Sequence, residues 1–436
     1  MTQTGATIAT VDGERELIRK IALRIVPLLA LGQLASYLDR SNIAIASLTM
    51  MPALGLDASQ FGLAAGLFFI GYFIGELPSN LLLVRFGARR WLARIMFTFG
   101  LISMCMAFVQ GPAMLYCIRI LLGLAEAGYA PGAVFYIAFW FPARYRSRIF
   151  GMFLLAIPIS AIIGAPISAA LLKLDGLAGM QGWQWLFIME GLPALLAAFL
   201  CLKYLPDSPA KAKWLDDDER RRLGEMLAKD LPVQQAHGNP VTAALRNVKM
   251  WQIALFSFGV ASGSYGTLFF LPQIISAFGT TNLETGLLNT IPFIAALIAM
   301  PLWARRSDRK GERRLHAACP LLAACIAFAL SGLATDPVIR MITLTIGTMG
   351  IFMAMGLLWS FVPQYFAAGV ESAAAIALVN MISTLSGVIQ PVAMGKLRVM
   401  TGDYNSGLLL TAALMLAGVI SVLMLKSEAD PSHERS

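Results

Sequence analysis

The sequence predicts an all-α membrane protein whose twelve transmembrane helices form two pseudo-symmetric halves of six. Three observations carry this prediction: the composition, a series of apolar segments, and a loop motif that occurs twice. Hydrophobic residues make up 58% of the 436 residues, charged residues make up 14%, and the mean hydropathy is +0.70. A soluble domain cannot shield that much apolar surface from water, whereas a bundle that faces lipid has no such need.

Twelve apolar segments follow one another along the chain, and most are long enough for a helix to cross about 30 Å of hydrocarbon. They lie near residues 21–47, 59–83, 92–109, 113–139, 149–172, 185–205, 251–279, 284–304, 315–334, 339–362, 372–395 and 405–425. The predicted organisation is an N-terminal tail, a first half, a central loop, a second half and a C-terminal tail, at 1–20, 21–205, 206–250, 251–425 and 426–436. The charged run in the central loop is typical of a solvated face, such as that of a short amphipathic helix.

Basic residues predict the orientation, because short cytoplasmic loops are enriched in Lys and Arg. They gather before the first segment and after the second, fourth and eighth: Arg15, Arg19, Lys20, Arg24, Arg85, Arg89, Arg90, Arg94, Arg144, Arg146, Arg148, Arg305, Arg306, Arg309, Lys310, Arg313 and Arg314. We therefore expect both tails and the central loop to lie in the cytoplasm. The formal charge of +9 is then a topology signal, and we expect no nucleic-acid partner.

A motif with the pattern R-x-G-x-R-R follows both the second and the eighth segment. It begins at Arg85 and again at Arg309, 224 residues later, which is where a duplicated six-helix unit would place it. Glycine permits a tight turn, and arginine can bind the carbonyl groups at helix ends. The candidate gating residues of these loops are Arg85, Gly87, Arg89, Arg90, Asp308, Arg309, Gly311 and Arg313.

An acid and a base stand side by side within the first segment, at Asp39 and Arg40. A charge near the middle of such a helix costs roughly 2.5–3.5 kcal/mol on insertion scales. At ~1.5 Å per residue, Arg40 lies about 22 Å along the helix from Ile25, which is too deep for its side chain to reach the interface easily. The two residues form either a structural ion pair or part of a transport pathway, and we favour the pathway.

A second pair of charges, Arg119 and Glu126, lies on the fourth segment. Seven residues are nearly two helical turns, so both side chains share one face, and that face should turn away from lipid. With Asp39 and Arg40, the interior then holds two acids and two bases and is neutral. An anionic substrate disturbs this balance and a proton restores it, which would couple the two. Alternatively, Arg119 and Glu126 only tie the fourth segment to the first.

These residues suggest roles in binding and in proton transfer. The planar guanidinium of Arg40 suits a substrate carboxylate, with Arg119 either sharing that contact or holding an acid. Glu126 and Asp39 are the candidate proton carriers. Weaker candidates for the substrate site are Tyr37, Tyr72, Tyr265, Trp359 and Asn380, and we expect Glu76, Glu190 and Glu371 to be structural.

The repeated loop resembles the signature of the major facilitator superfamily, although Val84 stands where that pattern places an acid and Asp308 fits it. Several stretches resemble the anion:cation symporter family, with its tartrate and 4-hydroxyphenylacetate branch: Tyr37–Asn42, Pro78–Leu83, Arg85–Trp91, Arg119–Gly128, Gly182–Phe187, Glu190–Pro193 and Lys211–Leu215. This resemblance implies proton-coupled uptake of a small carboxylate, such as a sugar acid or an aromatic acid, across a bacterial inner membrane. It points to the same charged residues of the first and fourth segments.

Other functions find less support in the sequence. The five cysteines lie singly in apolar segments and the three histidines are scattered, so we expect no disulfide framework, no metal site and no cofactor. There is no nucleophile elbow or phosphate-binding loop. We therefore expect a transporter that works as a monomer, whose partners are the carboxylate, protons and the lipid bilayer. An exchanger, an exporter, a membrane-embedded enzyme and a substrate sensor are the alternatives.

Overall fold

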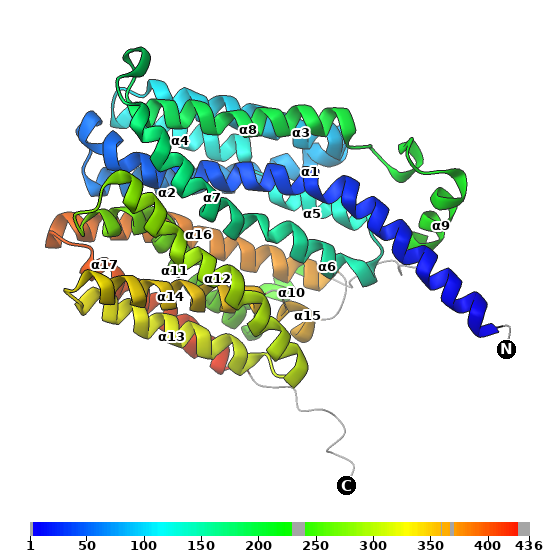
Figure 1. The fold of residues 1–436 in the computed structure, drawn as a ribbon. Coiled ribbons are helices and arrows are strands. Elements are labelled where there is room, and N and C mark those ends of the chain that lie inside the picture. The colour runs from blue at the N-terminus through cyan, green and yellow to red at the C-terminus, as the bar shows by residue number, and fades with distance from the viewer. Residues whose placement is uncertain (1–2, 229–239, 359, 367–369, 426–436) are drawn as a thin grey trace, which may run out of the picture. The chain divides into compact units, whose positions relative to one another are not determined.

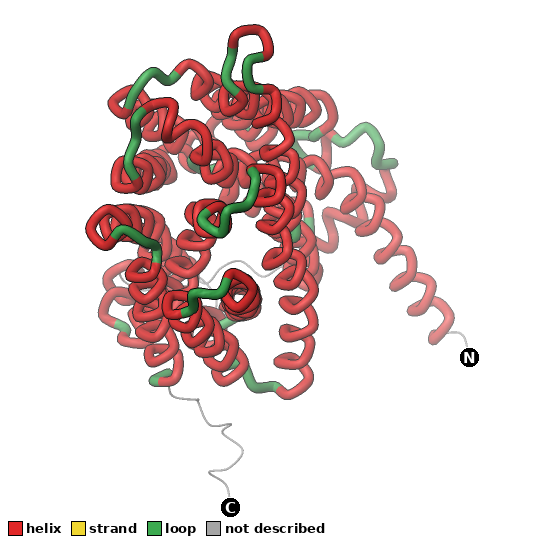
Figure 2. Tube along the Cα trace, turned by 60° about the vertical axis from the view of Figure 1, so that its left-hand side comes forward, coloured by secondary structure: helices red, strands yellow, loops and turns green. Residues whose placement is uncertain are grey.

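All secondary structure in the computed structural model is helical over the residues it describes, 3–228, 240–358, 360–366 and 370–425 (Figures 1 and 2). Within them, twelve helical stretches are long and apolar enough to cross a membrane, as the sequence predicts. The candidate Trp359 and the C-terminal tail lie outside the described residues.

The first six spans comprise α1 (Gln3–Leu54), α2 (Ala58–Phe86), α3 (Ala88–Cys105), α4 (Pro112–Glu126), α5 (Tyr129–Trp140), α6 (Ala143–Leu154), α7 (Ala156–Leu171) and α8 (Gly182–Tyr204). The fourth span is broken between α4 and α5, where Gly128 has a φ of 86°, and the fifth is divided between α6 and α7. Short 3₁₀ turns are η1 (Met106–Phe108), η2 (Leu172–Leu174), η3 (Leu177–Gly179) and η4 (Pro209–Lys211).

The central connection contains α9 (Asp217–Ala228) and α10 (Pro240–Arg246), and the second six spans follow it. They are α11 (Val248–Ser276), α12 (Asn282–Lys310), α13 (Arg314–Leu333), α14 (Pro337–Leu358) with the short α15 (Val362–Tyr365), α16 (Val370–Thr401) and α17 (Asn405–Leu423). The charged run of the central loop forms α9, an amphipathic helix that buries Leu223 and Met226. The expected solvated helix is therefore present.

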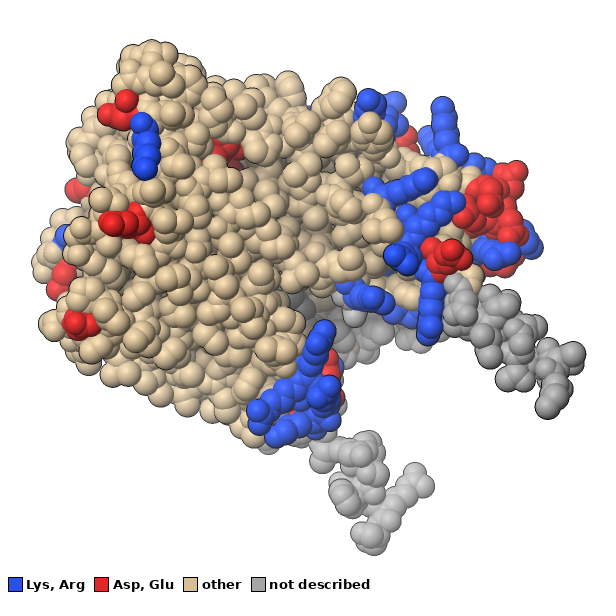
Figure 3. Space-filling model, viewed as in Figure 1, with Lys and Arg blue, Asp and Glu red and all other residues tan. Residues whose placement is uncertain are grey.

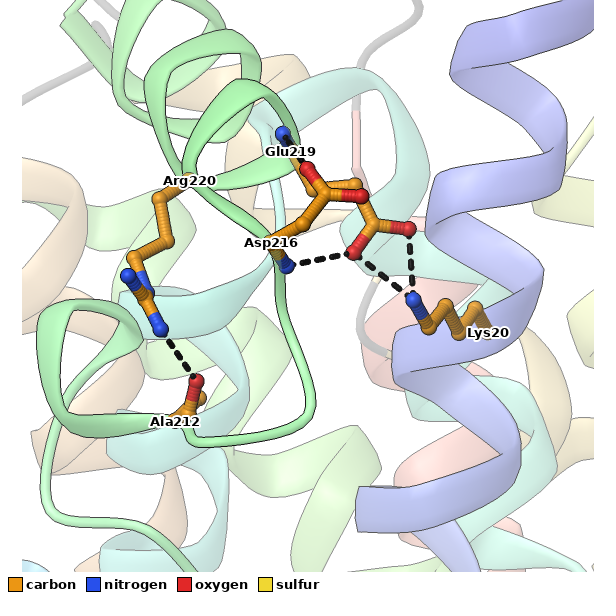
Figure 4. Close-up of polar contacts among 5 residues, drawn as sticks. All are labelled: Lys20, Ala212, Asp216, Glu219 and Arg220. Atoms are coloured by element: carbon orange, nitrogen blue, oxygen red, sulfur yellow. Dashed lines mark hydrogen bonds and ion pairs between the residues drawn. The ribbon is translucent and has the colours of Figure 1, made fainter.

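The N-terminal residues expected as a tail are helical from Gln3, because α1 continues without a break into the first span. Contacts with the central loop hold this extension. Lys20 Nζ lies 2.6 Å from Glu219 Oε1 and 2.7 Å from Oε2, and the backbone N–H of Asp216 donates to Glu219 Oε2 (Figure 4). On α9 itself, the Arg221 side chain donates to Asp218 and holds the pKa of that exposed carboxyl below its ordinary value.

An aromatic stack also holds the loop that precedes α9. The Trp214 ring stacks on the Trp140 ring of α5, with the two centroids 5.8 Å apart. On α1, Cζ of Arg24 lies 4.8 Å from the ring centroid of Trp214. Tyr136 donates to the carbonyl of Pro206. The first part of the central loop is therefore built into the first half of the chain.

The chain forms two units, Met1–Gly55 with Leu67–Pro232, and Leu56–Gly66 with Val233–Ser436. The start of α2 therefore groups with the second unit. In the first unit α8 packs against α1 and α3, and α1 packs against α7. In the second unit α13 packs against α14 and α17, and α11 packs against α16 and α17.

Basic side chains gather at one end of the helices in each unit on the face shown in Figure 3. In the first unit they surround α9 and the start of α1, and in the second they lie at the connection between α12 and α13. The rest of this face is mostly uncharged, as expected for a surface that meets lipid.

Candidate functional site

The deepest charged contact of the first unit joins α1 to α4. Arg40 Nε donates to Glu126 Oε1 at 2.7 Å, and Arg40 Nη2 lies 2.6 Å from the same oxygen. Arg40 is 7% exposed and Glu126 is fully buried, so water can contribute little to either charge. The Ser36 hydroxyl, one turn before Arg40, donates to Glu126 Oε1 as well. One carboxylate oxygen therefore accepts three hydrogen-bond or ion-pair contacts.

Three aromatic rings surround the Arg40 guanidinium. Its Cζ lies 5.0 Å from the ring centroid of Tyr37, 5.0 Å from that of Tyr72 and 5.4 Å from that of Phe68. The ring centroid of Phe68 also lies 4.8 Å from Cζ of Arg119, so this one ring contacts both Arg40 and Arg119. Cation–π contacts of this kind contribute about 0.5–2 kcal/mol each and restrain the guanidinium.

Arg119 and Asp39 form the other half of the charged cluster. Arg119 is 1% exposed and Asp39 is 2% exposed, and the two interact electrostatically, with Ser103 of α3 beside Asp39. Neither carboxylate oxygen of Asp39 meets a hydrogen-bond donor among the described residues. Arg40 thus hydrogen-bonds to Glu126, whereas its interaction with the neighbouring Asp39 is electrostatic.

Glycines bring α2 close enough to α4 for these contacts. A Cβ at Gly123 would lie 2.0 Å from the carbonyl oxygen of Phe68, and one at Gly71 would lie 2.1 Å from that of Ile120. The two backbones therefore touch, which places Phe68 and Tyr72 against the charged face of α4. Glu126 is the last residue of α4, and the left-handed conformation of Gly128 lets the chain turn there before α5.

The sequence-predicted residues of the first half therefore come together. Tyr37, Asp39, Arg40, Tyr72, Arg119 and Glu126 all lie in one cluster of the first unit. Sequence reasoning missed Phe68 and Ser36. Their positions four residues from Tyr72 and from Arg40, on the same helix faces, are the signal that could have found them.

The second-half candidates belong to the other unit. Tyr265 lies on α11 and Asn380 lies on α16, and both side chains are half-buried. Their part in a substrate site stays a prediction. No group of three or more His, Cys, Asp or Glu side chains among the described residues could hold a metal ion.

The two repeated loops turn at their glycines. Gly87 has a φ of 85° and Gly311 a φ of 65°, both in the left-handed region that glycine adopts without strain. Arg89 donates to the carbonyl of Leu202, and its Nη1 lies 4.0 Å from Asp207 Oδ2. Asp207 thus supplies a carboxylate to the loop in which Val84 replaces an acid.

In the second loop, Arg313 Nη2 lies 3.7 Å from Asp308 Oδ1. Arg85, Arg90 and Arg309 are exposed at these turns. Next to Arg313, partial burial raises the pKa of Glu312, but hydrogen bonds from the Leu315 N–H and from His316 outweigh it and leave that pKa below its ordinary value. The gating roles of both loops stay predictions.

Comparison with known families identifies the family of this chain. A family model described as Major Facilitator Superfamily matches residues 29–391 and 263–436, which together span most of the chain. The chain belongs to the major facilitator superfamily. This membership confirms the superfamily that the two R-x-G-x-R-R loops predict.

Relatives over the full length are transporters. A protein of Agrobacterium vitis named "Putative tartrate transporter" is 43% identical over 429 residues, covering 98% of this chain and 95% of that protein. The "Quinolone resistance transporter" of Acinetobacter baumannii is 39% identical over 412 residues, covering 94% of each chain. Since the family and these relatives are transporters, the chain is a transporter and not an enzyme, and its resemblance to tartrate transporters is confirmed.

Solved structures confirm the predicted fold. A D-xylose–proton symporter superposes with a TM-score of 0.71 at 18% identity, covering 92% of this chain and 96% of the other. A second structure is a bacterial homolog of the human lysosomal transporter Spinster in an inward-facing, unoccupied conformation. It superposes with a TM-score of 0.70 at 15% identity, covering 92% of this chain and 95% of the other. At these identities the likeness concerns the fold alone.

Proposed function

We propose that this transporter imports a small organic carboxylate together with a proton. The observation that carries the proposal is the buried pair of Arg40 and Glu126, in which a guanidinium suited to a carboxylate is already occupied by one. Removing one partner of such a pair costs about 3–5 kcal/mol, because it leaves a buried charge uncompensated. A substrate carboxylate that reaches Arg40 therefore competes with Glu126 for the same donors.

Protonation decides this competition. A protonated Glu126 loses the charge that holds Arg40, so the guanidinium becomes available to the substrate. Substrate at Arg40 in turn favours the protonated acid, and the two effects are equal by thermodynamic reciprocity. When both ligands leave, Arg40 and Glu126 pair again and the empty carrier has compensated charges. Asp39 is the second candidate proton carrier, with Arg119 as its counter-charge.

The remaining site residues contribute to recognition in this proposal. The rings of Tyr37 and Tyr72 contact the Arg40 guanidinium, and we assign their hydroxyls to hydrogen bonds with a substrate bound there. Tyr265, Trp359 and Asn380 are the candidates from the second half. The transporter alternates between openings to the two sides of a bacterial inner membrane, with both termini in the cytoplasm, and functions as a monomer.

The arginine and the relatives support the proposed substrate class. The tartrate named for the Agrobacterium vitis protein is a sugar acid, and the aromatic rings beside Arg40 also suit an aromatic carboxylate such as 4-hydroxyphenylacetate or nicotinate. Export is the second candidate function, because the Acinetobacter baumannii relative is named for quinolone resistance. An exporter would share the fold and differ in the direction of coupled flux.

Proteoliposomes test the proposal directly. Purified protein would be given radiolabelled tartrate, 4-hydroxyphenylacetate, nicotinate or a quinolone, with an inward proton gradient. We expect at least one small carboxylate to accumulate above its external concentration, and a protonophore to abolish that accumulation while exchange persists. Extrusion of the quinolone without accumulation of any carboxylate would favour the exporter.

Cysteine labelling tests the orientation independently. A cysteine introduced at Asp57, between α1 and α2, should react with an impermeant reagent added to intact cells. One introduced at Lys310 should react only after permeabilisation. The opposite pattern would overturn the proposed topology without affecting the coupling argument.

A further inference from the structure

A buried tyrosine fixes the start of α5 to α1, just after the break in the fourth span. Tyr129 is the first residue of α5 and is 1% exposed, and its hydroxyl donates to the Leu29 carbonyl of α1 at 2.8 Å. Gly32 of α1 makes room for this ring. A Cβ at Gly32 would lie 2.0 Å from the Tyr129 hydroxyl oxygen and 2.5 Å from its Cζ. The two helices therefore meet closely at this point.

The contacts of Glu126 lie further along the same stripe of α1. Leu29, Ser36 and Arg40 are seven and four residues apart, so they share one face of the helix. Leu29 receives the Tyr129 hydroxyl, while Ser36 and Arg40 both donate to Glu126. From Leu29 to Ser36 the rise is about 10 Å, whereas an unbroken helix would advance only ~4.5 Å between Glu126 and Tyr129. The break between α4 and α5 lengthens this step.

The two residues of the break form an elbow that α2 holds in place. Ala127 has an extended ψ of 135° and Gly128 has a φ of 86°, so the chain leaves the helical path there. A Cβ at Gly75 of α2 would lie 2.8 Å from Cβ of Ala127, and one at Gly128 would lie 2.3 Å from the Ser79 hydroxyl oxygen. That hydroxyl accepts a hydrogen bond from the Trp91 indole at 3.0 Å. The elbow therefore packs against α2, while the residues on either side of it contact α1.

We propose that Tyr129 is a positioning residue that determines how strongly Glu126 competes with substrate for Arg40. Its bond to Leu29 holds the elbow at one register along α1, which keeps the Glu126 carboxylate beside Ser36 and Arg40. An acid that is already in place loses less conformational entropy when the ion pair forms, so the pair is stronger. This inference rests on the proposed proton coupling and adds a residue outside the sequence-predicted site.

The direction of the expected effect distinguishes positioning from packing. A weaker pair between Arg40 and Glu126 competes less with an anionic substrate, so loss of the Tyr129 hydroxyl should tighten binding where Glu126 is ionised. Where Glu126 is protonated the competition is absent, and the affinity should stay at the wild-type value. A residue that only fills space would leave the affinity unchanged, or would lower it at every pH.

The charged and titratable groups around Glu126 stay the same in this test. Those that interact with it electrostatically are Tyr37, Asp39 and Arg40 of α1, Tyr72 of α2 and Arg119 of α4. Glu76 of α2 acts on Arg40 as well. Because removing the Tyr129 hydroxyl changes none of these groups, any pH dependence that they contribute is common to the variant and the wild type.

Tyr129→Phe tests the proposal, and Tyr136→Phe is its matched control. Tyr136 lies two turns further along α5, is equally buried, and donates to the carbonyl of Pro206 in the central connection. Each variant keeps its ring and loses one hydroxyl that binds a carbonyl group. The Leu29 carbonyl retains its hydrogen bond within α1, so Tyr129→Phe leaves no buried acceptor without a donor.

The measurement is the affinity of purified protein for radiolabelled tartrate, or for 4-hydroxyphenylacetate or nicotinate if that acid is the one accumulated in proteoliposomes. It is made at the acidic and the alkaline end of the pH range over which the wild-type affinity changes. Tyr129→Phe should bind about two- to tenfold more tightly than the wild type at the alkaline end, and equally at the acidic end. Tyr136→Phe should match the wild type at both ends.

The outcomes separate this inference from the proposed function. A wild-type affinity that does not vary with pH would overturn the proposed coupling, and the inference would fall with it. If the wild-type affinity varies and Tyr129→Phe matches it at both ends, the positioning role is wrong while the proposed function stands. An equal change at both ends would indicate packing, and the same alkaline gain in Tyr136→Phe would indicate a general loosening of α5. Either result would contradict the inference.

Discussion

The two units of this transporter bury different kinds of polar group. Among the described residues, the first buries five charged side chains, Asp39, Arg40, Arg119, Glu126 and Glu190. In the described part of the second, the buried polar side chains are hydroxyls and amides, apart from His316 near the start of α13. A buried charge responds to protons and anions and a hydroxyl does not, so this difference is why we place the proposed ion coupling in the first unit. The second unit uses neutral hydrogen bonds to hold its helices together.

The largest effect is expected at the arginine of the charged pair. Arg40→Lys keeps the charge but loses the planar fork, so substrate affinity should fall at least tenfold, or about 1.4 kcal/mol. Binding of the transported carboxylate to purified protein measures it. Arg94→Lys is the matched control, since Arg94 lies over Trp91 on α3 and outside the cluster, and it should change affinity less than about twofold. Wild-type affinity in Arg40→Lys would remove Arg40 from the substrate contact.

Two glycines of tight helix contacts sharpen the comparison between the units. A Cβ at Gly123 would lie 2.0 Å from a carbonyl oxygen of α2, and one at Gly350 would lie 2.2 Å from the carbonyl of Pro320. Each alanine variant should lose about 1–3 kcal/mol of stability through overpacking, seen as a lower melting temperature. Only Gly123→Ala should also weaken substrate binding, because it displaces Phe68 and Tyr72. Equal loss of binding in both would show that the site depends on the second unit to the same degree.

The smallest effect is expected at the neutral core of the second unit. Gln390 is fully buried, donates to the Thr411 hydroxyl, and has a carbonyl oxygen without a partner among the described residues. Gln390→Leu should change stability by only about 0.5–1.5 kcal/mol, because Thr411 keeps its bond to the Gly407 carbonyl. The pH profile of uptake should coincide with that of the wild type. A shifted profile would place proton coupling in the second unit too.

The sequence predicts the fold and the charged cluster for one physical reason. Apolar segments that are long enough to span a bilayer can be recognised directly in the sequence, and charged residues within them must face away from lipid. Asp39, Arg40, Arg119 and Glu126 were therefore expected inside, and they are buried together. The repeated arginine loops reveal the duplication without any tertiary information.

The pairing within the cluster could not be predicted. Asp39 and Arg40 are adjacent in sequence, but neighbouring residues on a helix point about 100° apart, so the rotation of α1 decides which acid meets Arg40. The four-residue spacing between Phe68 and Tyr72 is a weak signal in the sequence, because a phenylalanine that faces lipid can have the same spacing. The break in the fourth span after Glu126 depends on packing that no local sequence pattern encodes. The same holds for the contact between Lys20 of α1 and Glu219 of α9.

The competition between substrate and Glu126 for Arg40 is the central claim, and proton uptake on binding tests it most directly. Calorimetric titration of purified protein with its carboxylate, in two buffers of different ionisation enthalpy, counts the protons taken up per substrate. At a pH where the empty carrier holds Glu126 ionised, we predict uptake of about one proton by the wild type. Glu126→Gln, which mimics the protonated acid, should still bind substrate with almost no proton uptake. The same proton uptake by Glu126→Gln and the wild type would contradict the account.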